Sequence, residues 1–280
     1  MSQDHVHLQP DPIAFIGGGN MARSLIGGLV KRGVKPARIR VAEPVESLRA
    51  SLAAEFGVQV FAEAAEATHG AGLWLLAVKP QAMRSVCAAL AARVREQDPI
   101  VVSIAAGITS AQLERWLGGE AAVIRSMPNT PALLGAGVSG VFANARVDAE
   151  GRARAEALLA SAGEVVWIAD EARMDAVTAV SGSGPAYVFL LAEAMETAAR
   201  EQGLTAEAAR TLVQQTLLGA SRMLVESGEA PAELRRRVTS PNGTTQAAID
   251  TFQAGGFEAL VARAIEAATT RGRELSAAND

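Results

Sequence analysis

Short apolar segments alternate with amphipathic stretches of helical length over the first 167 residues, and this alternation restricts the fold more than any other feature. Segments such as 22–32 and 45–56 have helical length. The apolar segments between such stretches are short and bounded by Gly, Pro or Asn; they are Ile13–Ile16, Ile39–Ala42, Leu73–Val78, Ile100–Ile104 and Ala122–Arg125. Strands that are covered by helices on both faces have this pattern. We therefore expect an α/β fold of the Rossmann type, with a doubly wound parallel sheet and right-handed crossovers.

The strand pattern ends near Asp170, and the rest of the chain has the periodicity of helices. The expected helices are 171–180, 185–202, 206–227, 232–238, 244–253 and 257–275. This change predicts a flexible tail at 1–11, a dinucleotide-binding domain at 12–170 and an all-α domain at 171–280. Apolar residues within 211–225 cover more than one helical face, so we expect a homodimer built on the helical domain. A self-contained helical bundle is the alternative.

Charge and residue usage exclude several classes of protein. The 280 residues include 26 Lys and Arg against 30 Asp and Glu, a net charge of −4, which argues against a nucleic-acid partner. The one cysteine, Cys87, excludes an internal disulfide framework, and His5, His7 and His69 do not form a metal-binding pattern. No segment has the pattern of a signal peptide or a membrane span. We therefore expect a cytoplasmic protein with no metal and no membrane association.

A glycine-rich segment directly follows the first expected strand and opens the first expected helix. Residues 17–22 read Gly-Gly-Gly-Asn-Met-Ala, which fits the pattern Gly-x-Gly-x-x-Ala. In this pattern Gly17 permits a tight turn, Gly19 lets a pyrophosphate approach the backbone, and Ala22 permits close helix–sheet packing. Free N–H groups at the start of the helix then face the phosphates. The segment predicts a dinucleotide site, although a glycine-rich turn without a ligand has the same sequence.

Glu43 ends the second expected strand, 26 residues after Gly17. An acidic residue at this position accepts hydrogen bonds from the adenosine ribose and favours NAD over NADP. Arg40 and Arg49 are close in sequence and would instead hold the 2′-phosphate of NADP, so the sequence leaves the cofactor open. An exposed turn residue is the alternative for Glu43.

Three further loops follow strands, at the edge of the sheet where such folds bind ligands. They are residues 78–80, 105–107 and 127–131. Lys79 is placed to neutralise a phosphate or to contact the ribose, and a solvated lysine is an equal alternative.

Two segments of the helical half place small and hydroxyl residues ahead of a helix. They are Ser-Gly-Ser-Gly-Pro-Ala-Tyr at 181–187 and Ser-Pro-Asn-Gly-Thr-Thr at 240–245. Backbone N–H groups at a helix N-terminus suit an anion such as a carboxylate. Ordinary capping by Ser or Thr is the alternative for each segment alone.

Six ordered motifs resemble the pyrroline-5-carboxylate reductase family over residues 13–275. They are residues 15–21, 78–80, 103–107, 125–131, 177–187 and 238–245. One departure is Asn242, where many members have Gly. Since Asn tolerates a left-handed backbone best after Gly, we expect this turn to be kept.

The resemblance implies reduction of the cyclic imine 1-pyrroline-5-carboxylate to L-proline with NADPH or NADH, by dimers that often assemble into rings. It implies that the cofactor is bound by Gly17, Gly18, Gly19, Asn20, Met21, Glu43, Ala77, Val78, Lys79, Pro80, Ala105, Ala106, Gly107 and Asn129. It implies that the substrate is bound by Ser181, Gly243, Thr244 and Thr245. The Thr245 hydroxyl is the catalytic candidate, because the resemblance places it near the imine nitrogen.

The implied chemistry agrees with the scarcity of catalytic side chains. Ketone reduction needs a proton donor, usually His, Tyr or Lys. A cyclic imine can bind already protonated, so a site that holds the carboxylate, aligns the nicotinamide and excludes water suffices. Tyr187 is the alternative acid, although its position in the first turn of a helix favours a packing role.

Two other functions compete with this interpretation. A β-hydroxyacid dehydrogenase also joins a Rossmann domain to a helical domain, but it needs a catalytic lysine in the second half, and no lysine follows Lys79. The motif at 17–22 alone would also fit a non-catalytic dinucleotide sensor, but that function leaves the segments at 181–187 and 240–245 without a role.

Overall fold

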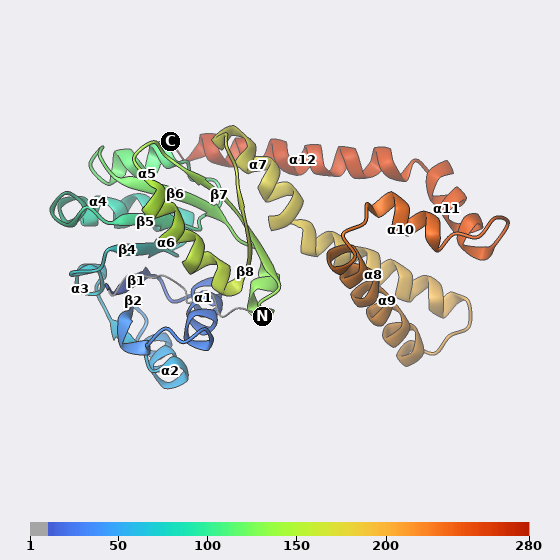
Figure 1. The fold of residues 1–280 in the computed structure, drawn as a ribbon, viewed down its shortest axis with the longest axis horizontal. Helices are drawn as coiled ribbons and strands as arrows, with labels where there is room; N and C mark the ends of the chain where they lie inside the picture. The colour runs from blue at the N-terminus through green and yellow to red at the C-terminus, as the bar shows by residue number, and fades with distance from the viewer. Residues whose placement is uncertain (1–10, 280) are drawn as a thin grey trace. The chain divides into compact units, whose positions relative to one another are not determined.

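The computed structural model describes residues 11–279, so residues 1–10 of the expected tail, with His5 and His7, lie outside the described residues. Figure 1 labels the elements. The strands are β1 (Ile13–Ile16), β2 (Ile39–Ala42), β3 (Gln59–Phe61), β4 (Leu73–Leu76), β5 (Ile100–Ser103), β6 (Ala122–Met127), β7 (Gly137–Ala143) and β8 (Gly163–Trp167). The α-helices are α1 (Asn20–Lys31), α2 (Glu46–Phe56), α3 (Ala64–Thr68), α4 (Pro80–Gln97), α5 (Ser110–Trp116), α6 (Ala149–Leu159), α7 (Met174–Val177), α8 (Gly184–Glu201), α9 (Ala206–Glu226), α10 (Pro231–Arg237), α11 (Thr244–Ala254) and α12 (Phe257–Ala278). The shorter helices are η1 (Pro36–Arg38), η2 (Thr130–Leu134), η3 (Ala160–Ala162), η4 (Glu171–Arg173) and the π-helix η5 (Thr178–Gly182).

The strands form one sheet in the order β3-β2-β1-β4-β5-β6-β7-β8. The pairs from β3 to β6 are parallel, whereas β7 is antiparallel to β6 and parallel to β8. Residues 128–136 join β6 to β7. This connection is too short for a parallel crossover, which needs about a dozen residues or more. The predicted doubly wound sheet is confirmed, but its last two strands reverse direction.

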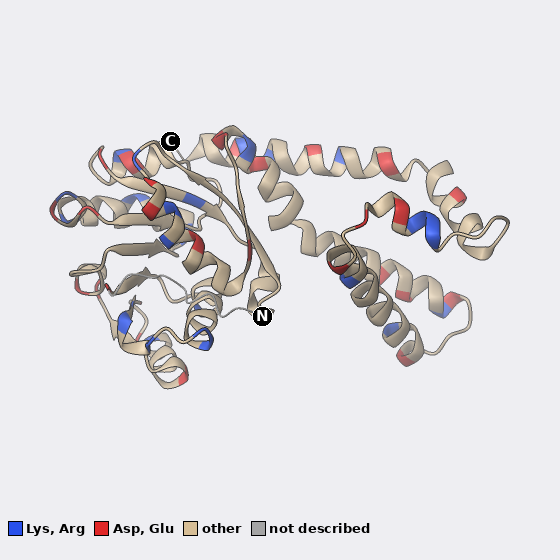
Figure 2. Cartoon of the chain, in the orientation of Figure 1, with Lys and Arg blue, Asp and Glu red and all other residues tan. Residues whose placement is uncertain are grey.

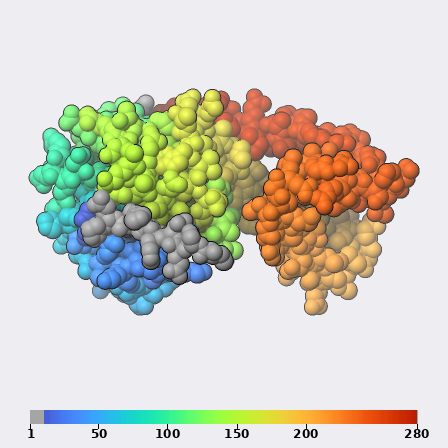
Figure 3. Space-filling view, viewed as in Figure 1, coloured from blue at the N-terminus to red at the C-terminus, as the bar shows by residue number. Residues whose placement is uncertain are grey.

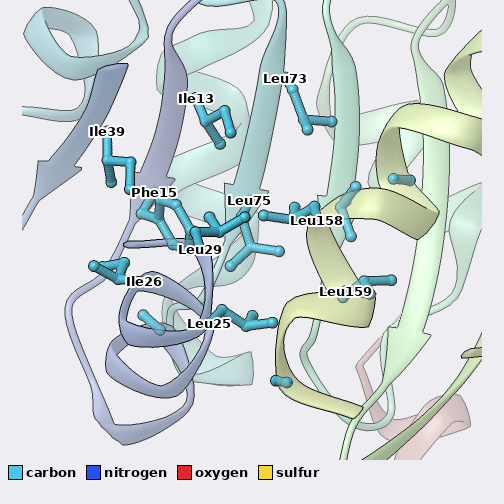
Figure 4. Close-up of a cluster of buried hydrophobic side chains, with 14 of the residues drawn as sticks. Ile13, Phe15, Leu25, Ile26, Leu29, Ile39, Leu73, Leu75, Leu158 and Leu159 are labelled. Atoms are coloured by element: carbon cyan, nitrogen blue, oxygen red, sulfur yellow. The ribbon is translucent and has the colours of Figure 1, made fainter. Parts of the chain in front are cut away.

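Each face of the sheet has its own apolar core. Leu25 and Ile26 of α1 and Leu158 of α6 pack on one face, as Figure 4 shows. Met83 of α4 and Leu113 of α5 are buried on the other face. The two layers fix the carboxyl ends of β1, β4 and β5 side by side, since Ile16 pairs with Leu76 and Leu76 with Ser103. The candidate cofactor loops start from this edge.

The segment after β8 departs from the single helix expected at 171–180. It forms η4, α7 and then η5, a π-helix that leads into α8. The Ser183 N–H donates to the Thr178 carbonyl, five residues earlier, at 2.8 Å. The helical conformation therefore continues through this segment, with a different hydrogen-bond pattern.

The described residues form two compact units, one of residues 11–183 with 268–279 and the other of residues 184–267. The second unit buries few apolar side chains. Its buried hydrophobic residues are Ala209, Val213 and Leu234, and α8 and α11 bury none. Figure 2 shows the first half of α8 free of charged residues, and the orange surface in Figure 3 belongs to α9–α11. A helix with apolar residues on all sides is normally buried, so this unit needs a covering surface.

None of the helices within residues 11–279 is both long enough and apolar enough to span a membrane.

Candidate cofactor and substrate sites

The glycine-rich loop between β1 and α1 has the backbone that a close ligand needs. Gly17 has φ +102°, and a Cβ there would lie 2.7 Å from the Ala77 carbonyl oxygen. A Cβ at Gly18 would lie 2.5 Å from the Leu52 side chain, whereas a Cβ at Gly19 would meet no atom within 4 Å. The absence of a side chain at Gly17 and Gly18 thus lets the loop pack closely against Ala77 and Leu52, whereas Gly19 borders open space. The tight turn expected at Gly17 is confirmed.

Two helices begin at neighbouring strand ends without a side-chain cap. Gly19 is the N-cap of α1 and Lys79 is the N-cap of α4, and neither residue has a side chain that accepts a capping hydrogen bond from the helix N–H groups. The Ala77 N–H donates to the Ile16 carbonyl at 2.7 Å, which brings the two loops together. Helix N-termini carry partial positive charge, and Lys79 adds an exposed cation. The predicted loop Ala77–Pro80 and the glycine-rich loop therefore form one cradle that suits a pyrophosphate.

Asn20 and Met21 form the first turn of α1. Asn20 is exposed and lines a groove of about 680 Å³ beside α1, together with Arg23 and Lys31. Met21 packs against the apolar core instead. Of these two predicted residues, Asn20 is exposed and Met21 is half-buried.

Glu43 is buried, and its carboxylate holds the protein's own backbone. One oxygen accepts from the Gly18 N–H and the other from the Val45 N–H, each at 3.0 Å. Arg49 lies beside it and donates to the carbonyls of Glu43 and Pro44 at 2.7 and 2.8 Å. The alternative of an exposed turn residue is therefore wrong, since Glu43 supports the glycine-rich loop.

Arg40, the other basic residue near the end of β2, donates to the His69 carbonyl. Of the two arginines considered for the 2′-phosphate, only Arg49 contacts the backbone at the end of β2. The role of Glu43 toward a ribose remains a prediction.

The loops after β5 and β6 are tied to segments far away in sequence. In the loop Ala105–Gly107, Gly107 has φ +71° and its carbonyl accepts from Asn279 Nδ2 at 3.0 Å. After β6, Asn129 uses both ends of its amide: Oδ1 accepts from the Val138 N–H at 3.0 Å, and Nδ2 donates to the Ser181 carbonyl at 3.2 Å. The predicted cofactor contact Asn129 thus also joins β7 to η5.

Ser181 does not lie at a free helix N-terminus, so that expectation for residues 181–187 is wrong. It belongs to η5, and its hydroxyl donates to the Val177 carbonyl at 2.9 Å. Pro185 lacks an N–H and cannot bond to the carbonyl four residues earlier, which is that of Ser181. Asn129 supplies a donor to this carbonyl instead. A π-helix among small residues often marks a functional site, because it shifts which groups point outward.

The second predicted segment does open a helix. Asn242 has φ +59°, as expected for a left-handed turn, and Gly243 is the N-cap of α11 without a side-chain cap. Thr244 is exposed and Thr245 is half-buried in the first turn. The hydroxyls of Thr244 and Thr245 thus do not serve as caps here, and the start of α11 suits a carboxylate.

Arg125, on the buried strand β6, was not anticipated as a structural centre. Its side chain is 5% exposed and lies 3.4 Å from Glu171 and 3.3 Å from Asp175. Glu171 also accepts from the N–H and the hydroxyl of Ser110, at 2.6 and 2.5 Å. A charged residue within an otherwise apolar strand was the sequence signal for this cluster.

No group of three or more metal-ligating side chains occurs in the part of the chain that the structure describes.

Comparisons with known proteins agree with this arrangement. The family described as "Pyrroline-5-carboxylate reductase dimerisation" matches residues 171–275, and "NADP oxidoreductase coenzyme F420-dependent" matches residues 12–107. The chain is 55% identical to pyrroline-5-carboxylate reductase of Pseudomonas aeruginosa over 264 residues, which cover 94% of this chain and 96% of that protein.

Two solved structures are similar over nearly the whole chain. Pyrroline-5-carboxylate reductase from Coxiella burnetii has a TM-score of 0.93 at 40% identity, covering 96% of this chain and 99% of that one. Pyrroline carboxylate reductase of Plasmodium falciparum with NADP bound has a TM-score of 0.83 at 26% identity, with the same coverage.

Proposed function

The chain belongs to the pyrroline-5-carboxylate reductase family, and we propose on this basis that it reduces 1-pyrroline-5-carboxylate to L-proline with NADPH or NADH. The observation that carries the proposal is the 55% identity to a named reductase over 94% of the chain. This reaction is the last step of proline biosynthesis. The absence of lysine after Lys79 argues against the β-hydroxyacid dehydrogenase alternative.

The cradle of α1 and α4 supports a dinucleotide at the carboxyl edge of the sheet. The open space in front of Gly19 leaves room for the pyrophosphate, and the uncapped starts of both helices supply N–H groups. Lys79 adds a positive charge against the phosphates. The reduced nicotinamide supplies a hydride when the cofactor is bound.

The start of α11 supports binding of the substrate carboxylate. We assign the carboxylate to the N–H groups and hydroxyls at Gly243, Thr244 and Thr245, and we place the Thr245 hydroxyl at the imine nitrogen. The Ser181 hydroxyl proton is donated to the Val177 carbonyl, so toward a substrate this oxygen is an acceptor.

The protonated imine needs no further acid. A hydride adds to the imine carbon, C2 of the pyrroline, which becomes C5 of proline; the C=N π pair moves to nitrogen, and a secondary amine results. The residues at the site therefore bind the charged groups of the substrate and orient it toward the nicotinamide, and the proton enters with the substrate.

The helical domain carries homo-oligomerisation, in agreement with its dimerisation-family match and its exposed apolar side chains. We propose a functional division at residue 170, with a dinucleotide-binding part at 12–170 and a substrate and dimerisation part at 171–280. Assembly of dimers into a ring and a cytoplasmic location remain predictions.

The test combines turnover with direct binding. Purified protein is mixed with 1-pyrroline-5-carboxylate and NADPH or NADH in parallel, and the loss of reduced-nicotinamide absorbance is followed. Thr245→Ala is expected to lower kcat by about ten- to a hundredfold, the effect of about 1.5–3 kcal/mol from a hydrogen bond to a charged group. Thr245→Ser keeps the hydroxyl and serves as the matched control.

NADPH affinity, measured by calorimetry, should be the same in all three proteins. Unchanged turnover in Thr245→Ala would remove Thr245 from the reaction. No cofactor oxidation by the wild-type protein would refute the proposed activity itself.

A further inference from the structure

Asn279, directly after α12, binds the loop that follows β5. Asn279 Nδ2 donates to the Gly107 carbonyl at 3.0 Å and to the Leu275 carbonyl at 2.9 Å. A Cβ built on Gly107 would lie 3.5 Å from both the Asn279 amide nitrogen and the Leu275 Cβ, so the helix end is in contact with the loop. Figure 1 shows the red end of α12 beside α5. Asn279 thus contacts a predicted cofactor loop 172 residues away in sequence.

This helix end is anchored by contacts that do not involve Asn279. Ser276 donates its hydroxyl to Asp175 at 3.4 Å and accepts at its carbonyl from Gln112 Nε2 at 3.2 Å. Gly272 is buried, and a Cβ there would lie 3.2 Å from the Asp175 Cβ. Arg125 holds the same Asp175 carboxylate. Removal of the Asn279 amide should therefore leave α12 docked.

The loop itself offers only backbone to a ligand. Ala105 and Ala106 carry methyl groups, Gly107 has no side chain, and Gly107 has a left-handed φ. Glycine restricts its backbone less than any other residue does, so Gly107 itself does little to hold the loop in one conformation. The hydrogen bond from Asn279 fixes the direction of the Gly107 carbonyl and with it the course of the loop.

The position of the loop in the sheet indicates which half of a dinucleotide it meets. β5 lies on one side of β1, beyond β4, whereas β2 and Glu43 lie on the other side. In folds of this type the adenosine lies toward β2, so the loop after β5 lies toward the nicotinamide half.

We infer that Asn279 is a positioning residue for the nicotinamide half of the cofactor, acting through Gly107. This inference rests on the proposed function, because it takes Ala105–Gly107 as part of the cofactor site. It gives Asn279 a role in cofactor binding that does not require contact with the substrate.

The test compares NADPH with its adenosine end alone. Binding of NADPH and of adenosine 2′,5′-bisphosphate is measured by calorimetry for wild type, Asn279→Ala and Asn279→Asp, which keeps the shape but loses the amide donor. Loss of one hydrogen bond is expected to raise the Kd of NADPH about three- to tenfold. The bisphosphate Kd and the Tm should not change. Arg273→Ala, an exposed truncation on the same helix, is the control and should bind both ligands like wild type.

The outcomes separate this inference from the proposed function. Equal NADPH affinity in wild type and both Asn279 variants would overturn the inference about Asn279. An equal loss of affinity for NADPH and for the bisphosphate would also overturn it, because that result indicates a general structural role. If wild type binds NADPH but does not reduce 1-pyrroline-5-carboxylate, the proposed activity fails while the binding comparison still decides the role of Asn279. Failure of wild type to bind either NADPH or NADH would refute both.

Discussion

Truncation of Phe189 tests the claim that α8 is buried by a second copy of the chain. Its side chain is 68% exposed in the single chain, within a run of apolar residues that includes Leu190 and Leu191. Burial of an aromatic side chain removes ~150–250 Å² from water, and at ~25 cal/mol per Å² the exposed two-thirds corresponds to about 2.5–4 kcal/mol for each copy. A two-fold dimer contains two copies, and alanine keeps one methyl group. Phe189→Ala should therefore weaken the dimer by about 4–7 kcal/mol, or roughly three to five powers of ten in Kd.

Sedimentation equilibrium over a range of protein concentrations measures this change. Phe189→Ala should dissociate at concentrations where wild type stays associated, and its Tm should rise with concentration. Leu48→Ala on α2 is the matched control, because Leu48 is 41% exposed but lies in the other compact unit. If Phe189→Ala associates as tightly as wild type and the control, the assignment of α8 to the interface is wrong.

Three other predictions test packing, cofactor access and thiol chemistry. Gly28→Ala should lower the free energy of unfolding by about 1–3 kcal/mol, because the new Cβ would lie 2.1 Å from the Ser161 carbonyl oxygen. Gly27→Ala is the control, because the new Cβ there would meet only the Phe56 side chain. Denaturant unfolding measures both variants, and equal stability would refute the close approach at Gly28. Gly19→Val should fold like wild type, since its Cβ meets no protein atom, yet abolish dinucleotide binding in calorimetry; retained binding would refute the placement of the pyrophosphate. Burial raises the pKa of the Cys87 thiol to about 12, so near neutral pH the thiol stays protonated and should react with an aromatic disulfide only after unfolding. Rapid reaction of the native protein would contradict its burial.

Local signals were sufficient for five of the eight strands, β1, β2, β4, β5 and β6. The apolar segments Ile13–Ile16 and Ile39–Ala42 coincide with β1 and β2, because both are short and bounded by turns. β3, β7 and β8 were not identified as strands, and β3 is only three residues long with no buried residue. β7 is interrupted by two glycines and a serine. β8 lies at the sheet edge with exposed residues at every second position, although residues 165–169 form an apolar run.

Among the site residues, too, local features were predictable from the sequence and contacts between distant segments were not. The turn at Gly17 and the left-handed Asn242 follow from local backbone preferences, and both were expected. The hydrogen bonds of Glu43 to Gly18, of Asn129 to Ser181 and of Asn279 to Gly107 join distant segments. No periodicity or spacing encodes such pairs, because they depend on how the layers pack.

Direct hydride transfer is the central chemical claim, and isotope labelling tests it most directly. The protein is incubated with 1-pyrroline-5-carboxylate and NADPH that carries deuterium at both C4 positions, and the proline formed is analysed by mass spectrometry and NMR. The account predicts one deuterium at C5 of proline from labelled cofactor, and none at C5 when unlabelled NADPH is used in deuterated water. Deuterium at C5 from the solvent, or none from the labelled cofactor, would contradict it.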